Sequence, residues 1–222
     1  MESFSDRQAS FIRGAEANDK RCRLNIRKLT PGLLVIVFSL AGWRDGMAQG
    51  TAPSIDCARA ATAVEEMVCR DSTLASLDRK LVEVYATASK AATSEQKNRL
   101  AADQQRWLNE RDGCAKSSDK NACAKERYMQ RIADLQAQFK LVTSHGPFHF
   151  VCNNDPANAL VAQYFDTEPA TARFTHDGRT VTAFIQRSGS GARYGGPSVS
   201  YWEHQGEASV VWFGRSMKCA TR

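Results

Sequence analysis

The hydrophobic pattern of this 222-residue chain changes its period near residue 141, and this change constrains the fold more than any other feature. Before that point, apolar residues recur three and four positions apart, as they do along one face of an amphipathic helix. After it, short aromatic and β-branched runs alternate with turn residues, which is typical of antiparallel strands. We therefore expect an α+β protein with two segregated domains, a small helical bundle followed by a small antiparallel β-barrel.

The helical pattern runs from about residue 62 to residue 140. "TAVE" (62–65) has the spacing of a capping box, in which a Thr hydroxyl and a Glu carboxylate satisfy backbone amides at a helix start. The connections between the periodic runs are short and polar, which favours antiparallel neighbours in a bundle. We expect Trp107 and Tyr128 in its core, and we interpret the charged residues as partly buried partners that fix helix packing rather than as a binding surface: Glu65, Asp78 and Arg111.

The strand pattern runs from Phe148 to the end of the chain. "HDGR" (176–179) predicts a hairpin, because Gly178 accepts the positive φ that a tight primed turn requires. We expect His176, in this polar turn, to be a solvated surface residue. An aromatic residue such as Trp202 on a small barrel is expected to be part of the core.

The chain begins with the features of a secretory signal peptide. A basic run, "RCRLNIRK" (21–28), precedes "LLVIVFSLAG" (33–42), an apolar run that is too short to span a bilayer as a stable helix. Small residues follow, and we expect cleavage after Ala48. Because Trp43 stands where a bacterial lipoprotein would carry its lipidated Cys, we expect a periplasmic mature chain without a lipid or another stable membrane anchor.

Of the seven cysteines, Cys22 leaves with the signal peptide, and the even number that remains indicates disulfides in an exported chain. No C-x-x-C spacing occurs, so a metal site is not expected. In the helical part the nearest neighbours in sequence are the preferred partners, although four cysteines allow three connectivities. A further bond would tie the two ends of the barrel. The expected pairs are Cys57–Cys69, Cys114–Cys123 and Cys152–Cys219.

These features divide the chain into four segments. We expect a signal peptide at 1–48, a helical domain at 49–140, a linker at 141–147 and a barrel at 148–222. The net charge of the whole chain is +6, but much of this surplus lies in the signal peptide, so nucleic acid is not an expected partner.

The glycine-rich stretch "RSGSGARYGG" (187–196) could be a phosphate-binding loop, a flexible linker, or a shaped loop. A phosphate loop would open a helix, but Pro197 and a strand follow, and strands on both sides argue against a linker. The alternative that this is a plain hairpin loop without function stays open.

Ser190, His204 and Asp177 can be written as a catalytic triad, but no strand–elbow–helix holds the serine. We therefore expect neither catalytic residues nor a cofactor.

The residues "SGSGARY", followed by "WEHQGEA" and a terminal "KC", resemble the MliC/PliC family of bacterial inhibitors of c-type lysozyme. This resemblance extends from Phe148 to Cys219. Four helical segments resemble the LprI-type domain, which is itself linked to lysozyme inhibition: "IDCARAATAVEEMVC", "LASLDRKLVEVY", "QQRWLNERDGC" and "CAKERYMQRIADL".

The resemblance implies an eight-stranded barrel whose loop inserts into the lysozyme cleft, where a Ser hydroxyl reaches the catalytic carboxyl groups. In this chain the serine is Ser190, and His204 stands where the family has a Lys. The implied lysozyme-binding residues are Ser190, Gly191, Arg193, Tyr194 and His204. Of these, Tyr194 is expected to pack at the loop base, whereas Arg193 could reach the cleft rim or be solvated. The alternative function is a non-catalytic module that binds another envelope protein or a glycan.

Overall fold

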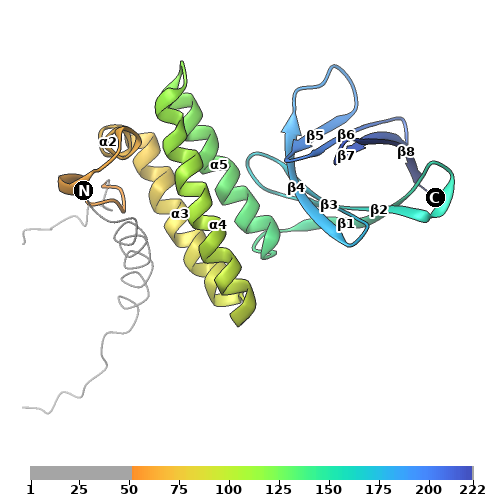
Figure 1. The fold of residues 1–222 in the computed structure, drawn as a ribbon, viewed down its shortest axis with the longest axis horizontal. Coiled ribbons are helices and arrows are strands. Elements are labelled where there is room, and N and C mark those ends of the chain that lie inside the picture. The colour runs from red at the N-terminus through yellow and green to blue at the C-terminus, as the bar shows by residue number, and fades with distance from the viewer. Residues whose placement is uncertain (1–51, 222) are drawn as a thin grey trace, which may run out of the picture.

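The computed structural model describes residues 52–221, and the expected signal peptide with Trp43 and Ala48 lies outside this range. A helical part is followed by a β-barrel (Figure 1). Two 3-10 helices and four α-helices form the first part: η1 (Cys57–Arg59), α2 (Ala63–Arg70), α3 (Ser72–Ala91), α4 (Ser94–Asp112), η2 (Gly113–Lys116) and α5 (Lys120–Gln138). Between residues 52 and 221, none of the helices combines the length and apolar character needed to cross a membrane.

The helix starts follow from local capping. The predicted capping box is confirmed, because Thr62 accepts a hydrogen bond from the amide of Glu65 while the Glu65 side chain bonds back to the cap. Asp71 ends α2 and also caps α3, where its carboxylate accepts from the amides of Thr73 and Leu74. One short residue thus produces the sharp turn between the two helices.

A buried polar network connects α2, α3, α4 and α5, and it contains Glu65, Asp78 and Arg111, as the sequence predicts. Arg111 Nη1 donates to the Tyr128 hydroxyl at 3.2 Å, and Nη2 lies 3.4 Å from Glu65 Oε1. The Tyr128 hydroxyl donates in turn to Asp78 Oδ1 at 3.1 Å. Burial raises the pKa of Tyr128, so the phenol stays neutral and both accepts and donates. Trp107 and Tyr128 are buried in the same core, as expected.

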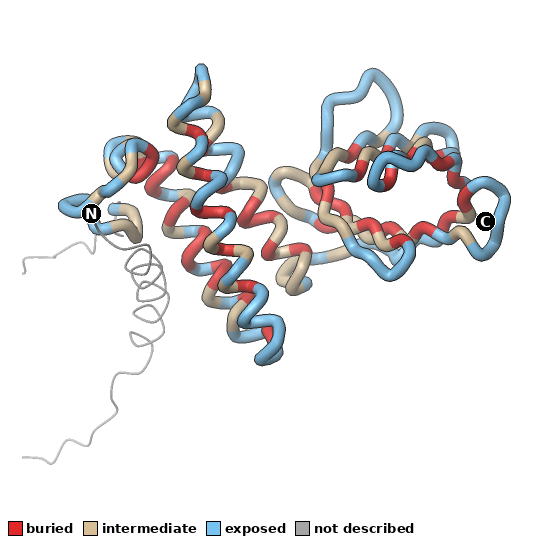
Figure 2. The backbone as a smooth tube through the Cα atoms, viewed as in Figure 1, coloured by how far each residue is buried: buried red, intermediate tan, exposed pale blue. Residues whose placement is uncertain are grey.

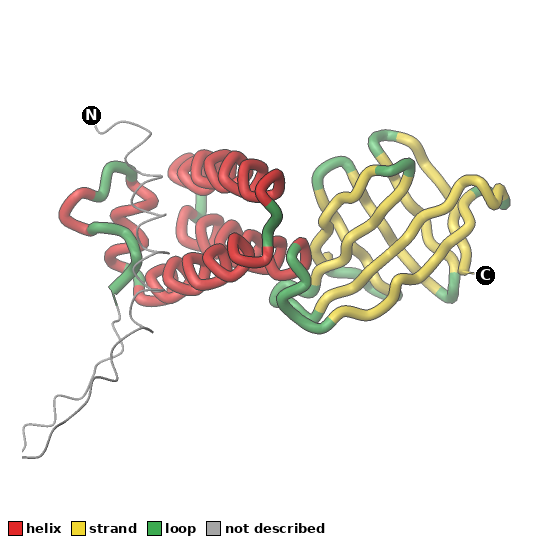
Figure 3. The backbone as a smooth tube through the Cα atoms, turned by 90° about the horizontal axis from the view of Figure 1, so that it is seen from below, coloured by secondary structure: helices red, strands yellow, loops and turns green. Residues whose placement is uncertain are grey.

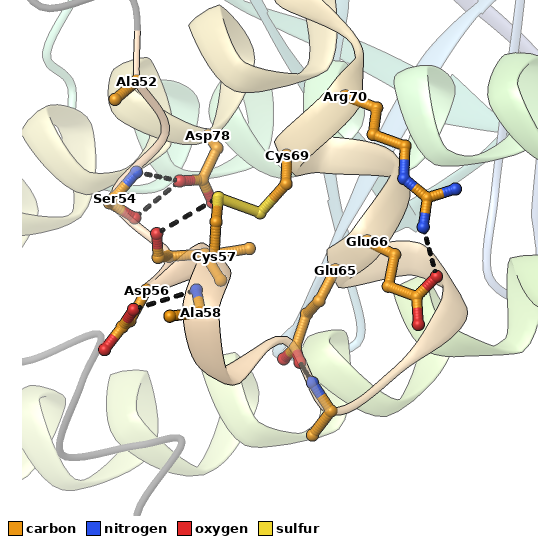
Figure 4. The surroundings of a disulfide bond; sticks show 12 residues. Ala52, Ser54, Asp56, Cys57, Ala58, Glu65, Glu66, Cys69, Arg70 and Asp78 are labelled. Carbon is orange, nitrogen blue, oxygen red and sulfur yellow. Dashed lines mark hydrogen bonds and ion pairs between the residues drawn. A yellow bond between two sulfur atoms is a disulfide. The ribbon is translucent and has the colours of Figure 1, made fainter.

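This network also holds the first described residues against the bundle. The other oxygen of Asp78 accepts from the backbone amide and the hydroxyl of Ser54, at 2.7 and 2.6 Å. Beside it, the disulfide Cys57–Cys69 joins η1 to α2 (Figure 4). The second disulfide of the helical part is Cys114–Cys123. Both are the pairs nearest in sequence.

The barrel consists of eight antiparallel strands, each paired with the next, and β1 pairs with β8 to close it (Figure 3). Cys152 and Cys219 face each other in this closing pair and form the third disulfide, so the two ends of the barrel are covalently joined. The strands are β1 (Ser144–Cys152), β2 (Asp155–Phe165), β3 (Thr171–His176), β4 (Arg179–Gln186), β5 (Ala192–Gly196), β6 (Val199–His204), β7 (Glu207–Trp212) and β8 (Arg215–Thr221).

The start of β1 and the position of His176 differ from the sequence-based expectations. β1 begins at Ser144, earlier than the expected Phe148, because the preceding residues already pair with the end of β2. His176 is buried rather than solvated: it is the last residue of β3, and the alternation of that strand turns it inward. Its Nδ1 donates to the carbonyl of Ala159 at 2.9 Å, and its ring packs against Trp212.

The predicted "HDGR" hairpin is confirmed. His176 pairs with Arg179, and the two residues between them have positive φ, 49° at Asp177 and 70° at Gly178. This is the backbone of a primed turn, whose twist matches that of the strands it joins.

The helical part meets the barrel through α5, which contacts β3 and β4. A cleft of about 610 Å³ lies between α4 and α5 on one side and β4 with the β5–β6 turn on the other. The charged side chains along its helical wall include two ion pairs, Arg106–Asp103 at 2.9 Å and Arg131–Asp134 at 3.1 Å.

Replacing Arg111 with Met tests whether the polar network holds the helices together. The variant would leave carboxylates buried without their cation, so we expect the free energy of unfolding to fall by about 3–5 kcal/mol. Urea denaturation followed by the helical circular dichroism signal measures this change. The control is Arg99→Met, which removes an exposed ion pair with Glu95 and should change stability by less than about 0.5 kcal/mol. Equal losses in both variants would refute a structural role for the network.

Candidate functional site

The candidate site is the loop of residues 187–191, which joins β4 to β5. Every residue in it is exposed, and Figure 2 shows this connection as an exposed segment that stands away from the barrel wall. Ser190 lies between Gly189 and Gly191, so neither of its sequence neighbours has a side chain beside its hydroxyl. Among residues 52–221, no group forms a hydrogen bond with that hydroxyl, which leaves it available to a partner.

The backbone of this loop is nevertheless held in place. Trp202 Nε1, on β6, donates to the carbonyl oxygen of Ser190 at 3.0 Å, and the Ser188 hydroxyl donates to the same oxygen at 2.5 Å. Two donors therefore hold the carbonyl group of Ser190, while its hydroxyl group remains available.

Gly191 brings the base of the loop against the end of β6. Its φ is +67°, and a Cβ on this residue would lie 2.0 Å from the carbonyl oxygen of Glu203. It would also lie 3.2 Å from the Cβ of His204. Only glycine allows this approach, because any side chain would meet backbone that cannot move aside. The loop therefore leaves the barrel at a fixed angle beside His204.

Replacing Gly191 with Ala should displace the loop and lower the stability of the barrel by at least about 1 kcal/mol, since the positive φ and the contact with Glu203 both oppose a Cβ. Thermal denaturation and the amide chemical shifts of residues 187–191 measure the two effects. Gly189→Ala is the matched control, because no atom lies within 4 Å of a Cβ there. A Gly191→Ala variant with unchanged shifts would show that the loop is not fixed at this point.

Tyr194 lies inside the barrel, below the loop. Its ring packs against Tyr164 with centroids 5.5 Å apart and against Phe174 at 6.2 Å. Burial raises the pKa of Tyr194. The side chain is thus placed where the residue pattern predicts, at the loop base, and it supports β5 instead of facing solvent.

Trp202, Arg193 and His204 lie on the outer surface of the barrel near the loop. The expectation that Trp202 belongs to the core is wrong, since 44% of its surface is exposed. The reason is strand alternation: Tyr201 turns inward and is fully buried, so its neighbour turns outward. The rings of Trp202 and His204 are nearly parallel with centroids 6.4 Å apart, and Arg193 lies opposite Trp202 in the β5–β6 register.

The residues of a conceivable catalytic triad are not brought together. Asp177 lies in the β3–β4 turn, at the end of β4 opposite to the loop of Ser190, and it contacts His176 and Arg215 there. Within residues 52–221, no group of three or more His, Cys, Asp or Glu side chains is arranged to hold a metal ion.

Trp202 is the residue whose role the sequence did not reveal. Its indole binds the carbonyl of Ser190, which lies twelve positions earlier in the chain. The two residues meet because β5 pairs with β6, and the sequence motif around Ser190 does not specify this pairing. The outward direction of Trp202, shared with His204, follows from strand alternation, and this was the one available signal.

Both parts of the chain are similar to known proteins. Residues 150–218 match the model of the family described as "MliC: Membrane-bound lysozyme-inhibitor of c-type lysozyme". Residues 57–135 match the model described as "Lysozyme inhibitor LprI". Proteins named "Lipoprotein LprI" from Mycobacterium bovis and Mycobacterium tuberculosis are 34% identical over 169 residues, which is 76% of this chain and 84% of each relative. The resemblance found in the sequence is thereby confirmed over both parts of the chain.

Proposed function

This chain belongs to the LprI family, and from this premise we propose that it inhibits c-type lysozyme by inserting residues 187–191 into the active-site cleft. Both of its parts match families of lysozyme inhibitors, which point to a non-catalytic protein. The observation that carries the proposal is the free hydroxyl of Ser190 on a loop whose backbone is tethered by Trp202.

The chemistry of the target explains why a serine suits this position. A glycosidase of this kind uses one protonated and one ionised carboxyl group on either side of the scissile bond. A hydroxyl group can donate to the ionised oxygen and accept from the protonated one at the same time. The small residues beside Ser190 let the backbone enter a groove in which larger side chains would clash.

The hydrogen bond from Trp202 to the Ser190 carbonyl, which we call the tether, lowers the entropy that the loop loses on insertion. A mobile loop loses conformational entropy when it binds, which weakens the complex, whereas a loop already held in its bound shape loses little. The bonds from Trp202 and Ser188 to the Ser190 carbonyl fix the backbone before any partner arrives. Occlusion of the cleft, without turnover, then accounts for inhibition.

Ser190→Ala tests the insertion directly. Loss of a hydrogen bond to a charged group costs about 1.5–3 kcal/mol, so we expect the inhibition constant to rise roughly 10- to 100-fold. Lysis of a bacterial cell-wall suspension by c-type lysozyme, titrated with the mature protein, measures it.

Ser216→Ala, at an exposed position of β8, is the control and should inhibit like the unaltered chain. An unchanged inhibition constant for Ser190→Ala would reject insertion of this residue. A mature protein that neither binds nor inhibits c-type lysozyme would instead favour a module for another envelope protein or a glycan.

His204 is the position where this chain departs from the family resemblance, which has a Lys there. The residue is exposed beside the loop base and stacks on Trp202. A lysine is charged throughout the neutral range, whereas an unperturbed histidine is mostly neutral at pH 8. A cation at this position would face the carboxyl groups of the cleft, so this chain should inhibit in a more pH-dependent way than a Lys version.

His204→Lys should therefore lower the inhibition constant at pH 8 by about threefold or more, because a lysine carries a full positive charge at that pH. Lysozyme inhibition by the two proteins, measured at pH 8, gives the comparison. Weaker or unchanged inhibition by the Lys variant at pH 8 would contradict a role for positive charge at residue 204.

We further propose that the protein acts in the periplasm after cleavage near Ala48. The relatives carry the name lipoprotein, and the MliC family is described as membrane-bound, which supports export. This chain differs in having Trp43 where a lipidated Cys would stand. A lipid-free mature form is consistent with that substitution.

A further inference from the structure

We propose that the barrel has a second contact surface for lysozyme, an outward-facing row formed by Arg193, Trp202 and Lys218, which binds acidic side chains at the rim of the cleft. This inference rests on the proposed function and extends it from the loop to the barrel wall. We call these three residues the basic row.

The strand register aligns the basic row across four neighbouring strands. Arg193 on β5 lies opposite Trp202 on β6, Trp202 lies opposite Ser209 on β7, and Ser209 lies opposite Lys218 on β8. Neighbouring strands are about 4.8 Å apart, so the row extends for three such steps along the outside of the barrel. It runs across the strands, beginning beneath the loop.

Alternation along each strand fixes the direction of these side chains. The residues next to them in sequence point inward and are buried: Tyr194, Tyr201, Val210, Met217 and Cys219. Arg193, Trp202 and Lys218 are exposed, and Ser209 between them is partly exposed. The basic row is therefore a continuous part of the surface.

The two cations of the basic row have no ion-pair partner in the part of the chain that the structure describes. Among residues 52–221, neither Arg193 nor Lys218 forms an ion pair, and Lys218 Nζ donates only to the Ser209 hydroxyl, at 2.7 Å. The carboxylate of Glu203 accepts from the amide of Gly206 and lies on the alternate side of β6. Two cations with an exposed indole between them thus have no carboxylate partner within residues 52–221.

This combination indicates a partner with acidic groups around an apolar contact. Trp and Arg are enriched among the residues that dominate binding energy at protein interfaces. An enzyme cleft that holds ionised carboxyl groups concentrates negative potential, and positive side chains near it gain affinity. The unpartnered cations of the basic row match this chemistry.

The basic row is also continuous with the loop. Trp202 belongs to both, because its Nε1 binds the Ser190 carbonyl while the residue remains 44% exposed. A protein that receives Ser190 in its cleft would bring the rim of that cleft close to Trp202 and Arg193. Lys218 is farther from the loop than the other two residues. Its substitution therefore distinguishes best between contact through the loop alone and contact that extends along the barrel wall.

The test uses Arg193→Glu and Lys218→Glu in the full mature chain, with c-type lysozyme as the probe. We expect each charge reversal to raise the Kd by about 3- to 10-fold, as measured by isothermal titration calorimetry at constant salt. Arg215→Glu is the matched control, since Arg215 lies on the same strand as Lys218 but beside the β3–β4 turn, where it contacts Asp177. It should bind like the unaltered chain.

Three outcomes would overturn the proposal that the basic row binds lysozyme. Lys218→Glu and Arg193→Glu could bind like the unaltered chain while Ser190→Ala binds weakly, which would leave the loop as the contact and remove the row. All three Glu variants could weaken binding equally, which would show a general charge effect. Failure of the unaltered chain to bind lysozyme would refute the proposed function itself, and with it the row.

Discussion

The hydrogen bond from Trp202 to the Ser190 carbonyl is the interaction on which the proposed site depends. It holds a loop of five exposed residues, two of them glycines, whose backbone would otherwise have wide conformational freedom. The close approach of Gly191 to Glu203 complements it by setting the angle at which the loop leaves the barrel. Together they leave the Ser190 hydroxyl free on a backbone that is already in place.

The barrel gives these contacts a rigid base. Its wall closes between β1 and β8, and the disulfide Cys152–Cys219 joins the same two strands. Below the loop, Tyr194 packs into a cluster of aromatic rings in the interior. The helical part has its own core and its own buried network around Arg111, and it meets the barrel chiefly through α5. Each part therefore has a separate source of stability.

Much of the fold could be predicted because its signals are local. The capping box at Thr62 and the hairpin at Asp177–Gly178 depend on residues a few positions apart, and the disulfide pairs were the simplest available. The errors arose where a side chain's direction depends on the exact strand register. His176 was assigned to a polar turn, although it is the last inward residue of β3. Trp202 was assigned to the core, although alternation turns it outward.

In the candidate site, too, some features could be predicted from the sequence and others depend on strand pairing. Resemblance to a family identified Ser190 and His204, whereas the tether and the basic row depend on pairing between β5, β6, β7 and β8, which the motif does not contain. The central claim is that the Ser190 hydroxyl reaches the carboxyl groups of lysozyme. A crystal structure of the complex tests it most directly. The account predicts Ser190 Oγ within about 2.5–3.0 Å of an oxygen of each catalytic carboxyl group. A complex in which residues 187–191 lie outside the cleft would contradict it.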